Sequence, residues 1–107
     1  MENRSDINKM QKRAMEIRNK YEEIEPKAWG VEQIFMGMVK DVGDLSKLLM
    51  INGGYRSDFN EDCREKLEHE IVDVFWSSLV LAQKLDVNLE EKFYQVMDEL
   101  EKKISIK

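Results

Sequence analysis

The sequence predicts an all-α protein built as an antiparallel four-helix bundle, and three observations support that prediction. Apolar residues recur at intervals of three and four in four successive segments, which is the period of one face of a helix. No segment shows the alternation of polar and apolar residues that is typical of a half-buried strand. The 107 residues include five Gly and one Pro, so few positions interrupt a helix.

The first two helices are predicted over residues 6–24 and 27–50. The first carries an apolar stripe with the spacing 3, 4, 3, 4, 3, formed by Ile7, Met10, Ala14, Ile17, Tyr21 and Ile24. Pro26 ends it, because the residue before a proline is disfavoured in the α conformation. The second is expected to end at residues 52–54, Asn-Gly-Gly, where Gly or Asn adopts the left-handed conformation that caps a helix.

The last two helices begin at capping signals. The third is expected to start near Asp58 or Asn60 and to end near Leu85, and the fourth to start at Asn88. A Glu three residues after Asp58 and after Asn88 completes the pattern of a capping box. The fourth helix carries a single apolar stripe, formed by Leu89, Phe93, Val96, Leu100 and Ile104. Short connections then favour antiparallel packing of the four helices.

The third helix predicts an oligomer. Residues 71–82 are apolar on almost every side of that helix, which is typical of a helix buried by several neighbours. Three other helices from a chain of this length are few to cover it. We therefore expect a homodimer, or a dimer of dimers, in which this helix packs against its copy. The alternative is a bundle core that is complete in the monomer.

Composition excludes several classes of partner. Lys and Arg number 17 and Asp and Glu 22, a net charge of −5, which disfavours binding to a nucleic-acid polymer. The N-terminus lacks the apolar run of a signal peptide, and no apolar stretch is long enough to span a membrane. One cysteine, Cys63, excludes an intramolecular disulfide and a Cys-rich zinc site. We expect one domain over residues 1–107, in a cytoplasmic protein.

Four carboxylates interrupt the apolar faces of the second and third helices. Asp41 occupies a position of the apolar stripe, and Asp44 lies one turn further at its border; Glu70 and Asp73 are related in the same way on the third helix. If these helices pack antiparallel, the four carboxylates converge, and like charges in a partly dry site require protons or a cation. Oxygen ligands suit Mg²⁺ or Mn²⁺. The alternative is four solvated surface carboxylates.

Two strings of residues resemble a known family. Asp-Val-Gly-Asp-Leu at 41–45 and Glu-Ile-Val-Asp at 70–73 are similar to the E-x-x-E and E-x-x-D signatures of the MazG-like all-α nucleotide pyrophosphohydrolases. The resemblance covers residues 28–95, and the first helix, within 1–25, matches only in kind. It implies a dimeric, Mg²⁺-dependent enzyme that cleaves nucleoside triphosphates, often deoxy or non-standard ones, to a monophosphate and pyrophosphate. The four carboxylates would then be its metal ligands and catalytic groups.

The chain departs from the family pattern at both ends of the site. Asp replaces Glu at both positions of the first acidic pair, which shortens each side chain by a methylene. In the last helix Lys92 matches, but Gln95 and Asp98 stand where the family often has Asn and Arg. For substrate binding we select Trp29 to stack on a base, Gln33 to read its edge and Lys92 to contact phosphate. The alternative for Trp29 is a place in the core.

Other residues are assigned structural roles. Trp76 is expected in packing or at a dimer interface, and His69 on the surface rather than as a catalytic base. Lys47 and Arg56 are further cationic candidates for phosphate, each with a solvated surface charge as the alternative. A different function also stays open, because the two shortened carboxylates fit a catalytically weak or inactive relative. Such a protein would act as a nucleotide-binding or helical interaction module.

Overall fold

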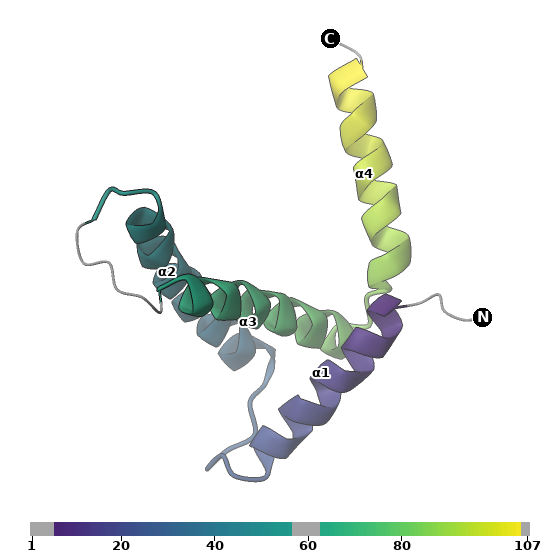
Figure 1. Cartoon of the computed structure of the whole chain (residues 1–107). Coiled ribbons are helices and arrows are strands. Elements are labelled where there is room, and N and C mark those ends of the chain that lie inside the picture. The colour runs from purple at the N-terminus through teal and green to yellow at the C-terminus, as the bar shows by residue number, and fades with distance from the viewer. Residues whose placement is uncertain (1–5, 57–62, 106–107) are drawn as a thin grey trace.

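A computed structural model describes residues 6–56 and 63–105, which form four α-helices (Figure 1). The helices α1, α2, α3 and α4 span Asp6–Glu22, Val31–Asn52, Cys63–Lys84 and Leu89–Ser105. Within these two described ranges no strand occurs, so the predicted all-α class is confirmed. None of the four helices is long and apolar enough to cross a membrane.

Helix α2 begins at Val31, four residues later than the predicted start at Lys27, and that prediction is wrong. The reason is a local cap. Gly30 is extended, with φ −89° and ψ −173°, and its N–H donates to Gln33 Oε1 at 2.8 Å. This hydrogen bond satisfies a backbone group just before the first turn. The chain after Pro26 therefore stays outside the helix.

The end of α2 agrees with the prediction for residues 52–54. Gly54 takes the left-handed conformation, with φ +83°, and its N–H donates to Ile51 O at 3.1 Å. The Tyr55 N–H donates to Met50 O at 2.8 Å. These two bonds make up a Schellman motif, which satisfies carbonyls of the last helical turn.

The start of α4 also agrees with the sequence, because Asn88 Oδ1 accepts a hydrogen bond from the Glu91 N–H at 3.1 Å. Helix α3 ends just before, at Lys84, where Asp86 takes the left-handed position with φ +62°. The predicted start of the third helix at Asp58 or Asn60, with its capping box, lies outside the described residues.

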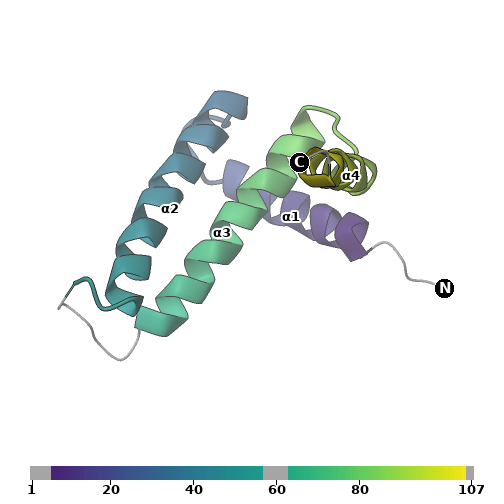
Figure 2. The same ribbon diagram turned by 90° about the horizontal axis from the view of Figure 1, so that it is seen from above.

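Helices α2 and α3 lie side by side and antiparallel, and α1 crosses the C-terminal half of α3 (Figures 1 and 2). The centre of the core lies where these three helices meet, and consists of Ala14, Ile34, Leu79 and Val80. Two side chains tie α1 to α3: Trp76 Nε1 donates to Ala14 O at 3.0 Å, and Gln11 Nε2 donates to Leu79 O at 3.1 Å. Trp76 therefore acts in packing, as expected.

Helix α4 projects away from the α2–α3 pair (Figure 1). Its first residue, Leu89, packs against the core, but no residue of Leu89–Ser105 is buried. The described chain thus consists of three packed helices and one projecting helix, rather than four helices side by side. Completion of a four-helix bundle by a second copy stays a prediction.

Candidate functional site

Three of the four predicted carboxylates meet between α2 and α3. Asp41 and Asp44 stand one turn apart on α2, and Glu70 faces them from α3. Each contributes one oxygen, and the three oxygens lie within 4.8 Å of one another. The i, i+3 spacing and the antiparallel pairing of the two helices together produce this arrangement. We call these three residues the acidic cluster.

Asp73 lies beside the acidic cluster but is turned towards His69. Its Oδ2 is 3.3 Å from His69 Nε2, and the His69 side chain is 73% exposed. His69 is thus a surface residue, as expected. The charge of Asp73 still acts on the cluster, because it raises the pKa of both Asp41 and Glu70.

The pKa values of two cluster residues are raised. Burial has the largest effect on the pKa of Asp41, followed by repulsion from Asp73. Burial also has the largest effect on the pKa of Glu70, followed by the charges of Asp41 and Asp73. Glu70 Oε1 is buried and has no hydrogen-bond partner among the residues that the structure describes. A lone carboxylate oxygen in that position is costly unless a proton or a cation meets it.

The ammonium group of Lys40 lies beside the acidic cluster. Lys40 Nζ donates to Asp44 Oδ2 at 2.9 Å, and this bond and the charge of Asp44 raise the pKa of Lys40. The Lys40 side chain is 76% exposed and that of Asp44 47% exposed. An ion pair this open is weak, so a divalent cation can compete for the Asp44 carboxylate.

The donor set fits a hard divalent cation. Oxygens bound to one Mg²⁺ at 2.0–2.1 Å lie at most about 4.2 Å apart. The three oxygens of the acidic cluster lie within 4.8 Å, so small rotations of side chains bring them into that range. Carboxylates alone, without His or Cys, favour Mg²⁺ or Mn²⁺ over softer metals.

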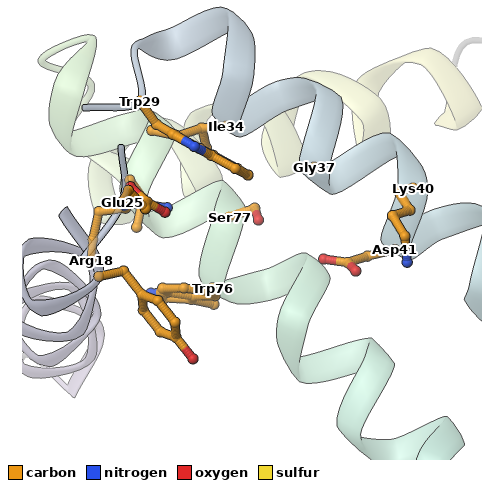
Figure 3. Close-up of a pocket in the computed structure, with 11 residues that line it drawn as sticks. Arg18, Glu25, Trp29, Ile34, Gly37, Lys40, Asp41, Trp76 and Ser77 are labelled. Atoms are coloured by element: carbon orange, nitrogen blue, oxygen red, sulfur yellow. The ribbon is translucent and has the colours of Figure 1, made fainter. Parts of the chain in front are cut away.

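An aromatic cavity of about 250 Å³ adjoins the acidic cluster at Asp41. Trp29, from the segment before α2, and Trp76, from α3, stand on opposite sides of it (Figure 3). The Asp41 carboxylate points towards this space from α2, and Ser77 of α3 lies between the two tryptophans. The cavity thus joins two aromatic side chains to one member of the cluster.

Trp29 is held in place from two sides. On one side the Arg18 guanidinium lies 4.9 Å from the centroid of the Trp29 ring. On the other, Trp29 Cζ3 would lie 3.1 Å from a Cβ atom built on Gly37. A larger residue at Gly37 would therefore push the indole aside. The structure places Trp29 at the cavity, with one part of its ring committed to packing.

Arg18 is a cavity residue that the sequence interpretation missed. It is buried, and its guanidinium donates to Glu25 at the end of the cavity. Its Nε atom is buried without a hydrogen-bond partner among the described residues, and Glu22 Oε2 lies 4.0 Å away. A signal existed in the sequence, because Arg18 follows Ala14 by four residues and so shares its core-facing side of α1.

The other two residues selected for substrate binding lie elsewhere. Gln33 uses its side-chain oxygen to cap α2 and does not line the aromatic cavity. Lys92 stands on the projecting helix α4, where its Nζ donates to Gln95 Oε1 at 3.0 Å. In the described chain, then, neither side chain reaches the acidic cluster or the aromatic cavity.

Comparison with known proteins adds no relative to this picture. No family model matches the chain, and neither does any curated protein or any solved structure. The resemblance to the MazG-like pyrophosphohydrolases therefore stays a prediction from two short strings of residues. The proposal that follows rests on the geometry of the site.

Proposed function

We propose that this protein is a Mg²⁺-dependent pyrophosphohydrolase that cleaves nucleoside triphosphates to a monophosphate and pyrophosphate. The observation that carries the proposal is the acidic cluster, in which carboxylates from two helices converge and one buried oxygen of Glu70 has no donor. Asp41, Asp44 and Glu70 bind the ion, and Asp73 joins them by rotating away from the exposed His69.

The residues around the metal site have different roles in the proposed hydrolysis. Bound Mg²⁺ supplies charge neutralisation for phosphate oxygens and orients a water for attack. A carboxylate of the cluster that is not fully engaged by the ion accepts the proton of that water. Lys40, now paired with Asp44, becomes available to phosphate once the ion holds that carboxylate.

The aromatic cavity supports a nucleoside as the organic part of the substrate. Trp29 and Trp76 present ring surfaces from opposite sides, and aromatic rings stack favourably on flat heterocycles. The Ser77 hydroxyl adds a donor and acceptor within the cavity. Since Asp41 belongs both to the cavity and to the acidic cluster, a base in the cavity brings its phosphates towards the ion.

We also propose that a second copy of the chain covers the surfaces that this copy leaves exposed. A groove between α1 and α3 is lined mainly by apolar side chains, with Lys9 and Arg13 on its α1 wall and His69 and Asp73 on its α3 wall; the apolar residues include Met10, Ile17, Val72, Phe75 and Leu79. Beyond Leu89, the large side chains Phe93, Leu100 and Ile104 of the α4 stripe are likewise exposed. At 100° per residue, Glu90 and Glu101 flank that stripe on one side. Lys92 and Lys103 flank it on the other side. Apolar fit, and charges of both signs that can pair with Lys9, Arg13 and Asp73 of the groove, favour α4 of a second copy as its occupant.

The test of the enzyme is pyrophosphate release from a panel of ribo- and deoxynucleoside triphosphates, with Mg²⁺, Mn²⁺ or EDTA. We expect metal-dependent release that Glu70→Gln lowers by at least about 100-fold, as is typical when a group that acts in the transition state is removed. Glu68→Gln is the matched control, because Glu68 is exposed and pairs with Arg64 on the same helix. This variant should retain full activity.

Two outcomes would contradict the enzyme. Release that persists in EDTA, or that survives Glu70→Gln, excludes the acidic cluster as the metal site. Binding of a nucleotide with Mg²⁺ but no release from any triphosphate favours the alternative, a nucleotide-binding module. The side chains of Asp41 and Asp44, each one methylene shorter than Glu, would be the physical reason for such a loss of turnover.

A further inference from the structure

A second cavity, of about 570 Å³, adjoins the acidic cluster on the side away from the tryptophans. Asp44 and Glu70 form the end that it shares with the cluster, and Lys47 of α2 and Lys66 and His69 of α3 line it further on. We call it the cationic cavity. It brings two lysines from two helices next to carboxylates that are proposed to hold a divalent cation.

Apolar side chains complete the wall of the cationic cavity. Leu48 and Ile51 of α2 and Cys63 of α3 line it, and of these Ile51 and Cys63 are buried. Among the residues that the structure describes, the cavity thus joins two lysines and an apolar wall to two carboxylates of the acidic cluster.

The aromatic cavity, the acidic cluster and the cationic cavity follow one another along α2 and α3. On α2 the helix passes from Gly37, against which Trp29 packs, to Asp41 and Asp44 and then to Lys47. These steps of four, three and three residues correspond to about 6, 4.5 and 4.5 Å along the helix axis. Helix α3 runs the opposite way beside it (Figure 2). Aromatic, acidic and cationic groups thus follow one another along the contact between α2 and α3.

We propose that the cationic cavity binds the pyrophosphate end of the substrate, with Lys47 and Lys66 as its phosphate ligands. This inference rests on the proposed function. The base then lies in the aromatic cavity, the α-phosphate lies at the acidic cluster, and the β- and γ-phosphates reach the two lysines. Pyrophosphate leaves through the cationic cavity, and the same residues bind it as a product.

The chemistry of the step is consistent with this placement. The oxygen of a water molecule bonds to the α-phosphorus, and the bond from that phosphorus to the α–β bridging oxygen breaks. The bridging oxygen departs with pyrophosphate and takes its electron pair, while a carboxylate of the acidic cluster accepts the proton of the water. Negative charge therefore grows on the leaving pyrophosphate, where ammonium groups of Lys47 and Lys66 stabilise it.

This assignment differs from the one that the sequence resemblance implies. The resemblance places a phosphate contact at Lys92, which stands on the projecting helix α4 and pairs with Gln95. Lys47 and Lys66 belong to the two helices that carry the acidic cluster, so their positions relative to the cluster are set within one chain. The two assignments therefore predict different effects for substitutions at these lysines.

The experiment measures binding of inorganic pyrophosphate in the presence of Mg²⁺ by titration calorimetry. We expect the double variant Lys47→Gln/Lys66→Gln to bind pyrophosphate at least about tenfold more weakly, because charge-assisted hydrogen bonds to phosphate are lost. Titration of Mg²⁺ alone should be unchanged in this variant. Lys92→Gln, the matched control, should bind pyrophosphate as the wild type does.

The outcomes separate this inference from the proposed function. Unchanged pyrophosphate affinity in the double variant, with normal Mg²⁺ binding, overturns the cationic cavity and leaves the enzyme intact. Loss of affinity in Lys92→Gln alone also overturns it, in favour of α4. If the wild type binds no Mg²⁺, the proposed function fails and this inference fails with it. Circular dichroism checks that each variant is folded.

Discussion

Helices α3 and α4 are both rich in apolar residues, yet α3 is partly buried and α4 is not. Helix α3 lies against α1 and α2 and buries six residues: Cys63, Leu67, Ser77, Leu79, Val80 and Ala82. Helix α4 has the clearer single stripe but buries none. Three residues of that stripe, Phe93, Leu100 and Ile104, are 55%, 46% and 73% exposed.

The contrast shows that an apolar stripe predicts which face of a helix is buried but not which surface buries it. For α3, helices α1 and α2 of the same chain cover one side, while Ile71, Val72 and Phe75 stay exposed. For α4 the stripe lies outside the three-helix core, and an uncovered row of large apolar side chains is typical of an interaction surface. A second copy, the proposed partner, would bury the apolar stripe of α4 as well.

The largest expected effect is that of a charge on the stripe of α4. Leu100→Glu should convert a dimer to a monomer and raise the dissociation constant at least about 100-fold, because a buried carboxylate would lack a partner. Lys102→Glu is the matched control, since residue 102 lies on the opposite side of α4, at about 160° from the centre of the stripe. Light scattering after size exclusion measures both. A wild type that is monomeric at high concentration would refute the proposed partner.

The second prediction concerns the acidic cluster and pH. The pKa of Asp41 and that of Glu70 are raised in the folded protein, so the folded state holds their protons more tightly than the unfolded state. Their contribution to the free energy of unfolding is complete below the unfolded pKa, near 4, and is lost as pH rises through the folded pKa. In EDTA we therefore expect the melting temperature to fall as pH rises through this range.

Removing one carboxylate charge should restore stability that the acidic cluster loses as pH rises. At pH 7 in EDTA, Asp41→Asn should raise the melting temperature by about 2–8 °C, the range for about 0.5–1 kcal/mol in a domain of this size. Mg²⁺ at about 100 times its dissociation constant should stabilise the wild type by about 2.7 kcal/mol and the variant by less. Glu68→Gln again serves as control. A Mg²⁺ effect of equal size in wild type and Asp41→Asn would place the ion elsewhere.

Much of the fold could be predicted from the sequence, because helix periods and caps are local. The bonds at Asn88 and at Gly54 are made with residues fewer than six positions away. The start of α2 was mispredicted for a local reason too, since the Gln33 side chain caps Gly30 and so is not available to a base. The place of α4 could not be predicted, because it depends on surfaces far away in the sequence or in another molecule.

The candidate site likewise has one part that the sequence could predict and one part that it could not. The approach of Asp41, Asp44 and Glu70 was expected from their spacing and from antiparallel pairing, but the same argument included Asp73, which the structure turns towards His69. The aromatic cavity could not be predicted in this way, because it depends on how α1 crosses α3, which is set by contacts such as that from Trp76 Nε1 to Ala14 O. Arg18 enters the site only through that crossing.

A small effect is also expected at the start of α4, and its location tells whether α4 is docked. Asn88→Ala removes the cap that Asn88 Oδ1 provides to the Glu91 N–H and should cost about 1 kcal/mol. If α4 packs on a second copy, its unfolding is coupled to that of the core, so the whole loss appears in the melting of the core. If α4 stands alone, only its own helicity falls, seen by hydrogen exchange in residues 89–105, and the core melts unchanged. Asn88→Ser keeps a capping oxygen and should leave both measurements as in the wild type.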